Sequence, residues 1–118
     1  MKLFVCTLAA LALTGGPAFA HAHLVKADPK VGSTVAKAPM HLWLRFNEVL
    51  RLAGSGAELV APDGHAQVLT LSQDPKDVRA VIAPVPPNLP PGRYQVRWKA
   101  LSPDAHHTQG DFSFTVGR

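Results

Sequence analysis

The chain has 118 residues, and its 12 Lys and Arg against 8 Asp and Glu give a formal net charge of +4 with neutral histidines. This length suits one domain, and the basic residues are dispersed along the chain, so the charge does not favour a nucleic-acid surface. The sequence contains no GxGxxG, P-loop or GxSxG motif, which argues against nucleotide-binding and serine-hydrolase functions.

Residues 1–20 have the pattern of a secretory signal peptide. A positive charge near the start is followed by an almost wholly apolar run, 3–13, and Ala18-Phe19-Ala20 is a small-x-small cleavage site. The apolar run is shorter than the ~18 residues that a membrane span needs. We therefore expect cleavage after Ala20, a periplasmic location, and a mature domain of residues 21–118.

The remainder of the chain shows the pattern of short β-strands. Eleven prolines and nine glycines interrupt the sequence too often for long helices. Apolar and polar residues alternate instead; for example, Tyr94, Val96 and Trp98 share one face of a strand and are expected in the core. The expected strands, about seven in number, cover residues 22–26, 41–46, 57–61, 65–71, 78–82, 93–99 and 111–116.

Two local signals connect these strands. Pro62-Asp63-Gly64 is a turn tripeptide, and it predicts a hairpin between 57–61 and 65–71. The stretch from Leu89 to Tyr94 fits the tyrosine-corner pattern, in which a Tyr hydroxyl closes a corner of a sandwich. Short strands with regularly spaced turns predict an all-β domain, a single Greek-key β-barrel or β-sandwich.

Two polar stretches at the ends of this domain point to a metal site. After cleavage, the α-amine and the ring Nδ1 of His21 can chelate one metal, and a second imidazole opposite completes the set of three nitrogens called a histidine brace. Asp104 and His106 are spaced i, i+2, which on extended backbone places both on one face. Nitrogen and oxygen donors in a tetragonal array suit Cu(II). The sequence therefore predicts a Cu(II) site formed by His21, Asp104 and His106.

His23 leaves a second geometry open, because a histidine third from a free amine can bind Cu(II) together with two deprotonated backbone amides. That arrangement needs a loose N-terminus, whereas a strand beginning at Ala22 would occupy those amides. The brace is favoured, with His23 as a neighbour or an additional ligand. The other histidines, His41, His65 and His107, are expected to face solvent.

These residues resemble the CopC family of periplasmic copper-resistance proteins, and the resemblance covers the whole mature chain. The segments that carry it are His21-Ala22-His23-Leu24-Val25 with Pro29 and Gly32, Leu42 to Glu48, Leu89 to Trp98, and Ser102-Pro103-Asp104-Ala105-His106 followed by Gly110, Phe112, Phe114 and Val116. The resemblance implies a β-barrel of cupredoxin or immunoglobulin-like shape that binds Cu(II) through His21, Asp104 and His106.

The same resemblance implies a non-enzymatic copper carrier or buffer, which acts in copper resistance or transport, with an inner-membrane importer of the CopD type as a partner. We expect a monomer. Some family members hold Cu(I) in a methionine-rich loop, but residues 51–77 contain no Met, and Cu(I) needs such soft ligands. The resemblance therefore implies the Cu(II)-only subtype.

Two other functions stay open from the residues alone. A brace site can activate oxygen, which would make the protein a copper-dependent oxidase or monooxygenase, although this small chain lacks evident substrate-binding insertions. The histidines can also be incidental, in a β-sandwich that binds another protein and no metal. Turnover with oxygen or peroxide would identify the copper-dependent enzyme. Equilibrium dialysis that shows no bound Cu(II) would identify the interaction domain.

Overall fold

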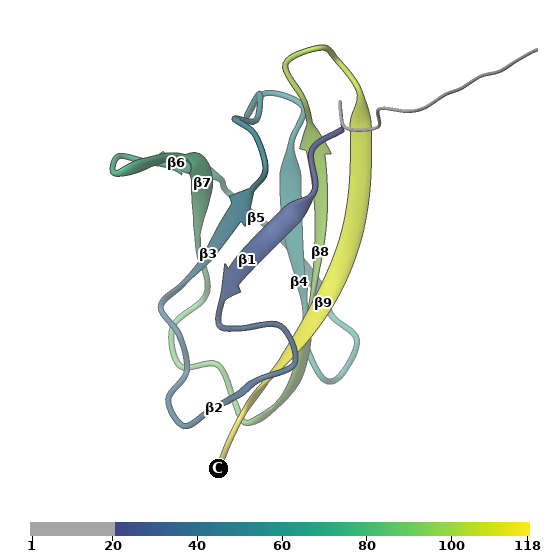
Figure 1. Cartoon of the computed structure of the whole chain (residues 1–118). Helices are drawn as coiled ribbons and strands as arrows, with labels where there is room; N and C mark the ends of the chain where they lie inside the picture. The colour runs from purple at the N-terminus through teal and green to yellow at the C-terminus, as the bar shows by residue number, and fades with distance from the viewer. Residues whose placement is uncertain (1–20) are drawn as a thin grey trace, which may run out of the picture.

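The computed structural model describes residues 21–118, which form nine β-strands in two sheets (Figure 1). The expected signal peptide, residues 1–20, lies outside the described residues. In spatial order, one sheet comprises β1 (Leu24–Asp28), β3 (His41–Phe46), β7 (Asp77–Pro84) and β6 (Ser72–Asp74). The other comprises β2 (Thr34–Val35), β9 (His107–Val116), β8 (Gly92–Leu101), β4 (Gly56–Val60) and β5 (Ala66–Leu69). Among the strand pairs of residues 21–118, β2 and β9 are parallel and the others are antiparallel.

The β-sandwich predicted from the alternating pattern is confirmed, with two strands more than expected. The additional strands, β2 and β6, have two and three residues, which is too short for an alternating pattern to show in the sequence. The hairpin predicted at Pro62-Asp63-Gly64 is present, because β4 and β5 pair in antiparallel fashion across it and Gly64 adopts a positive φ of 94°. Within residues 21–118, no helix is long and apolar enough to cross a membrane.

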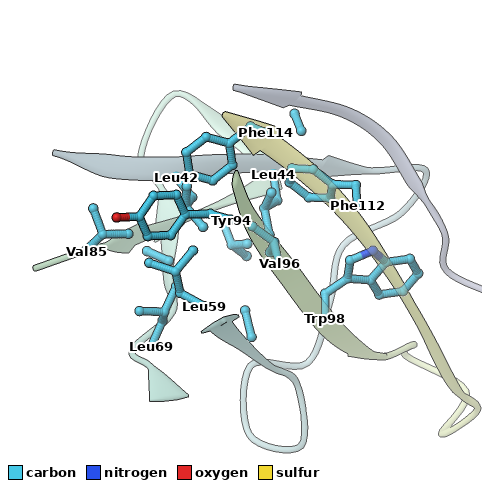
Figure 2. Packing of buried hydrophobic residues seen from close by; sticks show 14 of the residues in the cluster. Leu42, Leu44, Leu59, Leu69, Val85, Tyr94, Val96, Trp98, Phe112 and Phe114 are labelled. Atoms are coloured by element: carbon cyan, nitrogen blue, oxygen red, sulfur yellow. The ribbon is translucent and has the colours of Figure 1, made fainter. Parts of the chain in front are cut away.

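The core lies between the sheets and is built from the alternate residues that the sequence pattern places inward (Figure 2). Trp98 and Phe46 meet edge to face from opposite sheets, with ring centroids 5.2 Å apart. Burial of each large apolar side chain contributes roughly 1.5–3 kcal/mol. The principal contributors are Leu42, Leu44 and Phe46 of β3, Leu59 of β4, Tyr94, Val96 and Trp98 of β8, and Phe112, Phe114 and Val116 of β9.

Tyr94 forms the predicted tyrosine corner. Its hydroxyl donates a hydrogen bond to the carbonyl oxygen of Pro90 at 2.6 Å, and its ring stacks on Phe114. Burial raises the pKa of the hydroxyl above its ordinary value, so it remains a hydrogen-bond donor at neutral pH. The start of β8 is thereby fixed to the proline-rich segment that precedes it.

The long β8–β9 pair extends from the tyrosine corner to the opposite end of the sandwich. The two strands pair without a register shift from Gly92 with Val116 to Leu101 with His107. The segment between them, residues 102–106, therefore sits at a fixed position on a rigid support. This segment contains Asp104 and His106.

Gly110 has no room for a side chain, because it pairs directly with Trp98 on the neighbouring strand. A Cβ at position 110 would lie 2.5 Å from Cζ2 of the Trp98 indole, which is held in the core. We expect Gly110→Ala to destabilise the protein by about 1–3 kcal/mol, the usual cost of overpacking. The matched control is Gly56→Ala, since a Cβ there meets no atom within 4 Å. Thermal unfolding followed by circular dichroism tests this, and equal stability of the two variants would contradict it.

The β6–β7 hairpin projects from the sandwich (Figure 1), and aspartates hold it to β3. Asp77 accepts a hydrogen bond from the Arg45 guanidinium at 2.8 Å and one from the Arg79 backbone N–H at 3.0 Å, and these bonds lower the pKa of its carboxyl. A lowered folded-state pKa stabilises the fold above the unfolded-state pKa of 3.8, and this stability is lost as the pH falls through the folded value.

Asp77→Asn should therefore lower the melting temperature at neutral pH, and the difference from wild type should shrink on acidification. Melting curves from about pH 6 down to about pH 2.5 measure this difference across the relevant titration. A difference that stays constant over the range would show that the charge of Asp77 contributes nothing to stability.

Candidate metal centre

Ser102 organises the loop that joins β8 to β9. It is fully buried, and its hydroxyl donates a hydrogen bond to the Asp104 carboxylate. The same oxygen accepts a hydrogen bond from the His106 backbone N–H at 3.2 Å. Backbone bonds from Ser102 N–H to His106 O and from Ala105 N–H to Ser102 O, at 3.0 and 2.9 Å, close the loop. The buried hydroxyl of Ser102 therefore holds both Asp104 and His106 in place.

Asp104 and His106 lie side by side, but the backbone between them is not extended, although the sequence had led us to expect an extended backbone there. Ala105 has a φ of 69°, so the chain turns there. This turn brings Oδ2 of Asp104 within 3.0 Å of Nδ1 of His106. The expectation of extended backbone was wrong because the Ser102 hydrogen bonds, which are local but not visible as a periodic pattern, stabilise a tight turn instead.

The electrostatics of this pair suit a cation. The Ser102 hydroxyl first, and the His106 ring second, lower the pKa of the Asp104 carboxyl below its ordinary value. Asp104 is therefore ionised at neutral pH. Its side chain and that of His106 are 48% and 55% exposed, so both reach solvent at this end of the sandwich.

The start of the described chain lies beside this loop (Figure 1). The His21 ring meets the His106 ring edge to face, with centroids 4.8 Å apart and an interplanar angle of 63°. Thr108, the second residue of β9, donates a hydrogen bond from its hydroxyl to the Ala22 carbonyl at 2.6 Å, and Ala22 itself is fully buried. The fold thus brings together two histidines from opposite ends of the domain.

Asn47, immediately after β3, holds the same segment from the other side. Its Oδ1 accepts the His23 backbone N–H at 2.7 Å, and its Nδ2 donates to the His21 carbonyl at 3.2 Å. The Asn47 backbone N–H also donates to the His23 carbonyl, at 3.1 Å. The strand begins at Leu24, two residues later than the expected Ala22, and the His23 N–H is bonded by the Asn47 side chain and not by a neighbouring strand.

His106 is the shared member of two contacts, one with His21 and one with Asp104. Among the described residues, no three His, Cys, Asp or Glu side chains converge as a complete metal site. In the full 118-residue chain Ala20 precedes His21, so the nitrogen of His21 is a peptide nitrogen and is not available as an amine ligand. Two imidazoles and an ionised carboxylate at one solvent-exposed end are nevertheless a donor set that fits Cu(II).

The remaining histidines, His23, His41, His65 and His107, are exposed to solvent. His65 contacts Asp63 through Nδ1 and Oδ2 at 2.9 Å, but Pro62 of that turn lies against Gly92, at the far end of β8. His41 begins β3 and His107 begins β9, and both side chains face solvent as expected. His23 is exposed next to the cluster, with its backbone bound to Asn47.

The roles of Ser102, Asn47 and Thr108 were not predicted from the sequence. Ser102 lies within four residues of both its partners, Asp104 and His106, and Ser side chains commonly form such local hydrogen bonds in turns, so a local signal existed. Asn47 and Thr108 act on residues far away in the sequence, and no single-sequence pattern reveals such pairs.

The chain is thus a small β-sandwich that gathers His21, Asp104 and His106 at one solvent-exposed end, which defines a candidate metal site. The CopC domain model matches residues 24–117, and the chain therefore belongs to the CopC family. This membership, together with relatives that are named copper resistance protein C, confirms the expected class, a copper-binding resistance protein and not an enzyme.

Three known proteins illustrate the relationship. Copper resistance protein C of Escherichia coli is 37% identical over 121 residues, which cover 88% of this chain and 93% of that protein. The crystal structure of CopC from Methylosinus trichosporium OB3b superposes with a TM-score of 0.76 at 30% identity, covering 82% of this chain and 94% of that one. Copper transport protein CutJ of Bacillus subtilis is 28% identical over 101 residues, 85% of this chain but only 19% of CutJ.

Proposed function

We propose that the processed protein, beginning at His21, is a periplasmic Cu(II) carrier that acts in copper resistance, buffering or transport. The ligands are the amine and ring of His21, the His106 imidazole and the Asp104 carboxylate. The observation that carries this proposal is the contact between the His21 and His106 rings, 4.8 Å between centroids. His106 also contacts Asp104, so all three proposed side chains are linked through one residue.

The surroundings of the cluster support a carrier that exchanges its metal. Asp104 and His106 are about half exposed, so copper can enter and leave without a large rearrangement of the fold. The rigid β8–β9 pair and the buried Ser102 keep the two ligands in place before copper arrives. Preorganised ligands lose less conformational entropy on binding, which raises affinity.

The composition of the domain supports Cu(II) over Cu(I). Met40 is the single methionine of residues 21–118; its side chain is 82% exposed, and it lies outside the histidine cluster. The one cysteine, Cys6, belongs to the expected signal peptide. Cu(I) prefers several soft thioether or thiolate ligands, and residues 21–118 offer only the one thioether.

The proposed partner is an inner-membrane copper transporter of the CopD type. CutJ supports this proposal, because a domain similar to this chain occupies about a fifth of that longer protein, which is named for copper transport. Since the cluster lies exposed at one end of the sandwich, that end is where a partner would receive the ion. All proposed ligands come from one chain, which is consistent with a monomer.

Equilibrium dialysis of the processed protein tests the proposal and its metal preference. We expect one Cu(II) bound per chain, and Zn(II) displaced by Cu(II) in line with the order of divalent affinities. Chelator competition under reducing conditions should show Cu(I) held much more weakly. Equal retention of Cu(I) and Cu(II) would overturn the Cu(II) assignment, and no copper bound at all would favour an interaction domain.

A further inference from the structure

The first three residues of the described chain are held on both sides, although they precede the first strand. Asn47 binds the segment through its amide side chain at His21 and His23, and Thr108 binds it at Ala22. The Ala22 side chain is fully buried in the core cluster. Residues at the start of a domain usually fray, so this degree of fixation needs a physical explanation.

The hydrogen bond from the His23 N–H to Asn47 has a direct consequence for copper chemistry. If copper were held by the first three residues alone, the backbone nitrogens of Ala22 and His23 would have to lose their protons and bind the metal. A deprotonated nitrogen cannot donate a hydrogen bond, and at 2.7 Å it would face the lone pairs of Asn47 Oδ1. Wrapping the segment around a metal would also pull Ala22 out of the core.

The second Asn47 hydrogen bond acts on the residue that supplies the amine. Nδ2 of Asn47 donates to the His21 carbonyl at 3.2 Å, which limits rotation of the peptide that follows His21. The ring of His21 lies against His106 in this orientation. One side chain therefore blocks one chelate geometry and favours the other.

We infer that Asn47 is a positioning residue of the copper site, which directs His21 toward His106 and keeps the His23 amide out of the coordination sphere. This inference rests on the proposed function, since it assumes that copper binds at His21. It answers the question that the sequence left open between the brace and the chelate of the first three residues. Asn47 does not touch the metal in this scheme.

The experiment uses protein with His21 as its first residue, loaded with one equivalent of Cu(II). We expect Asn47→Ala to move the visible absorption of copper to shorter wavelength, because deprotonated amides are stronger-field ligands than imidazole or carboxylate. The electron paramagnetic resonance spectrum should change with it. In a double-mutant cycle, His106→Ala should lower affinity strongly in wild type and little in the Asn47→Ala background, where His23→Ala should become the costly change.

Thr108→Val is the matched control, since it removes a hydrogen bond to the same segment but leaves both Asn47 side-chain bonds intact. We expect it to keep the wild-type copper spectrum. A spectral shift in Thr108→Val equal to that in Asn47→Ala would overturn the specific role of Asn47 and indicate general loosening of the segment.

Asn47→Asp provides a second variant if Asn47→Ala does not fold, which thermal unfolding of the apo protein will show. A carboxylate still accepts the His23 N–H but cannot donate to the His21 carbonyl. The copper spectrum of Asn47→Asp should therefore show no coordination by deprotonated amides, and the appearance of amide coordination there would refute the blocking role.

The failure of the inference and the failure of the proposed function give different results. If His106→Ala has no effect on copper binding in the wild-type background, the proposed site itself is wrong. If His106→Ala is equally costly in the wild-type and Asn47→Ala backgrounds, and the spectra of these two backgrounds are the same, the site stands and Asn47 has no positioning role.

Discussion

Addition of one glycine in front of His21 should lower the affinity for Cu(II) by more than about 100-fold. Loss of a residue that merely supports a metal ligand typically costs ~10–100-fold in affinity. The added glycine converts the His21 amine into a peptide nitrogen, so a direct ligand is lost, together with the chelate ring that joins it to the imidazole. The His21–His106 ring contact remains available, which confines the change to the amine.

Competition titration against a chromophoric chelator measures this difference between the two forms of the protein. The control is the melting temperature of each form without metal. We expect the two values to be the same, because Asn47 and Thr108 hold the segment that includes residues 21 and 22 in both forms. Equal copper affinity of the two forms would exclude the amine as a ligand. The same comparison tests the proposed processing site, since a protein isolated after export should match the form that begins at His21.

Much of the fold could be predicted because one face of each long strand meets the core and the other meets water. In β8 the residues Tyr94, Val96 and Trp98 are buried while Arg97 and Lys99 are exposed, which is the pattern that the sequence shows. The tyrosine corner was predictable for a different reason. Its two partners, Tyr94 and Pro90, are four residues apart, so the interaction is local.

The short elements and the exact conformation of the β8–β9 loop could not be predicted in the same way. β2 has two residues and pairs with the distant β9, so no periodicity marks it. At Ala105 the backbone turns because a buried hydroxyl, that of Ser102, offers hydrogen bonds that compete with an extended strand. The side-chain pairing of Asp104 and His106 was anticipated, but the turn that produces it was not.

The candidate site depends on contacts between residues far apart in the chain, and such contacts cannot be predicted from the pattern of a single sequence. His21 and His106 come together only because β1 and the β8–β9 loop lie at the same end of the sandwich (Figure 1). The resemblance to the CopC family implied that His21 and His106 would lie close together. Asn47 carries no comparable signal, because an Asn after a strand is common and its partners are identified only by the fold.

The chain contains two similar Asp and His pairs, and a comparison of them distinguishes a proposed metal ligand from an ordinary surface histidine. Asp63 and His65 have the same spacing as Asp104 and His106, and their Nδ1–Oδ2 distances are 2.9 and 3.0 Å. Both pairs lie at turns, and both are exposed to solvent. The difference is that His21 lies against His106, whereas Asp63 and His65 are at the far end of β8.

His106→Ala should therefore lower Cu(II) affinity by more than about 100-fold, since it removes a direct ligand and not a supporting group. His65→Ala should leave the affinity unchanged within about twofold, because surface substitutions away from a site have small effects. Asp104→Ala should give an intermediate loss, since it removes a charged oxygen donor but leaves the nitrogen ligands. Chelator competition on the three variants and wild type, each beginning at His21, measures these differences. Equal losses in His106→Ala and His65→Ala would mean that copper binds exposed Asp and His pairs without selection. The clustering of His21 with His106 would then have no part in copper binding.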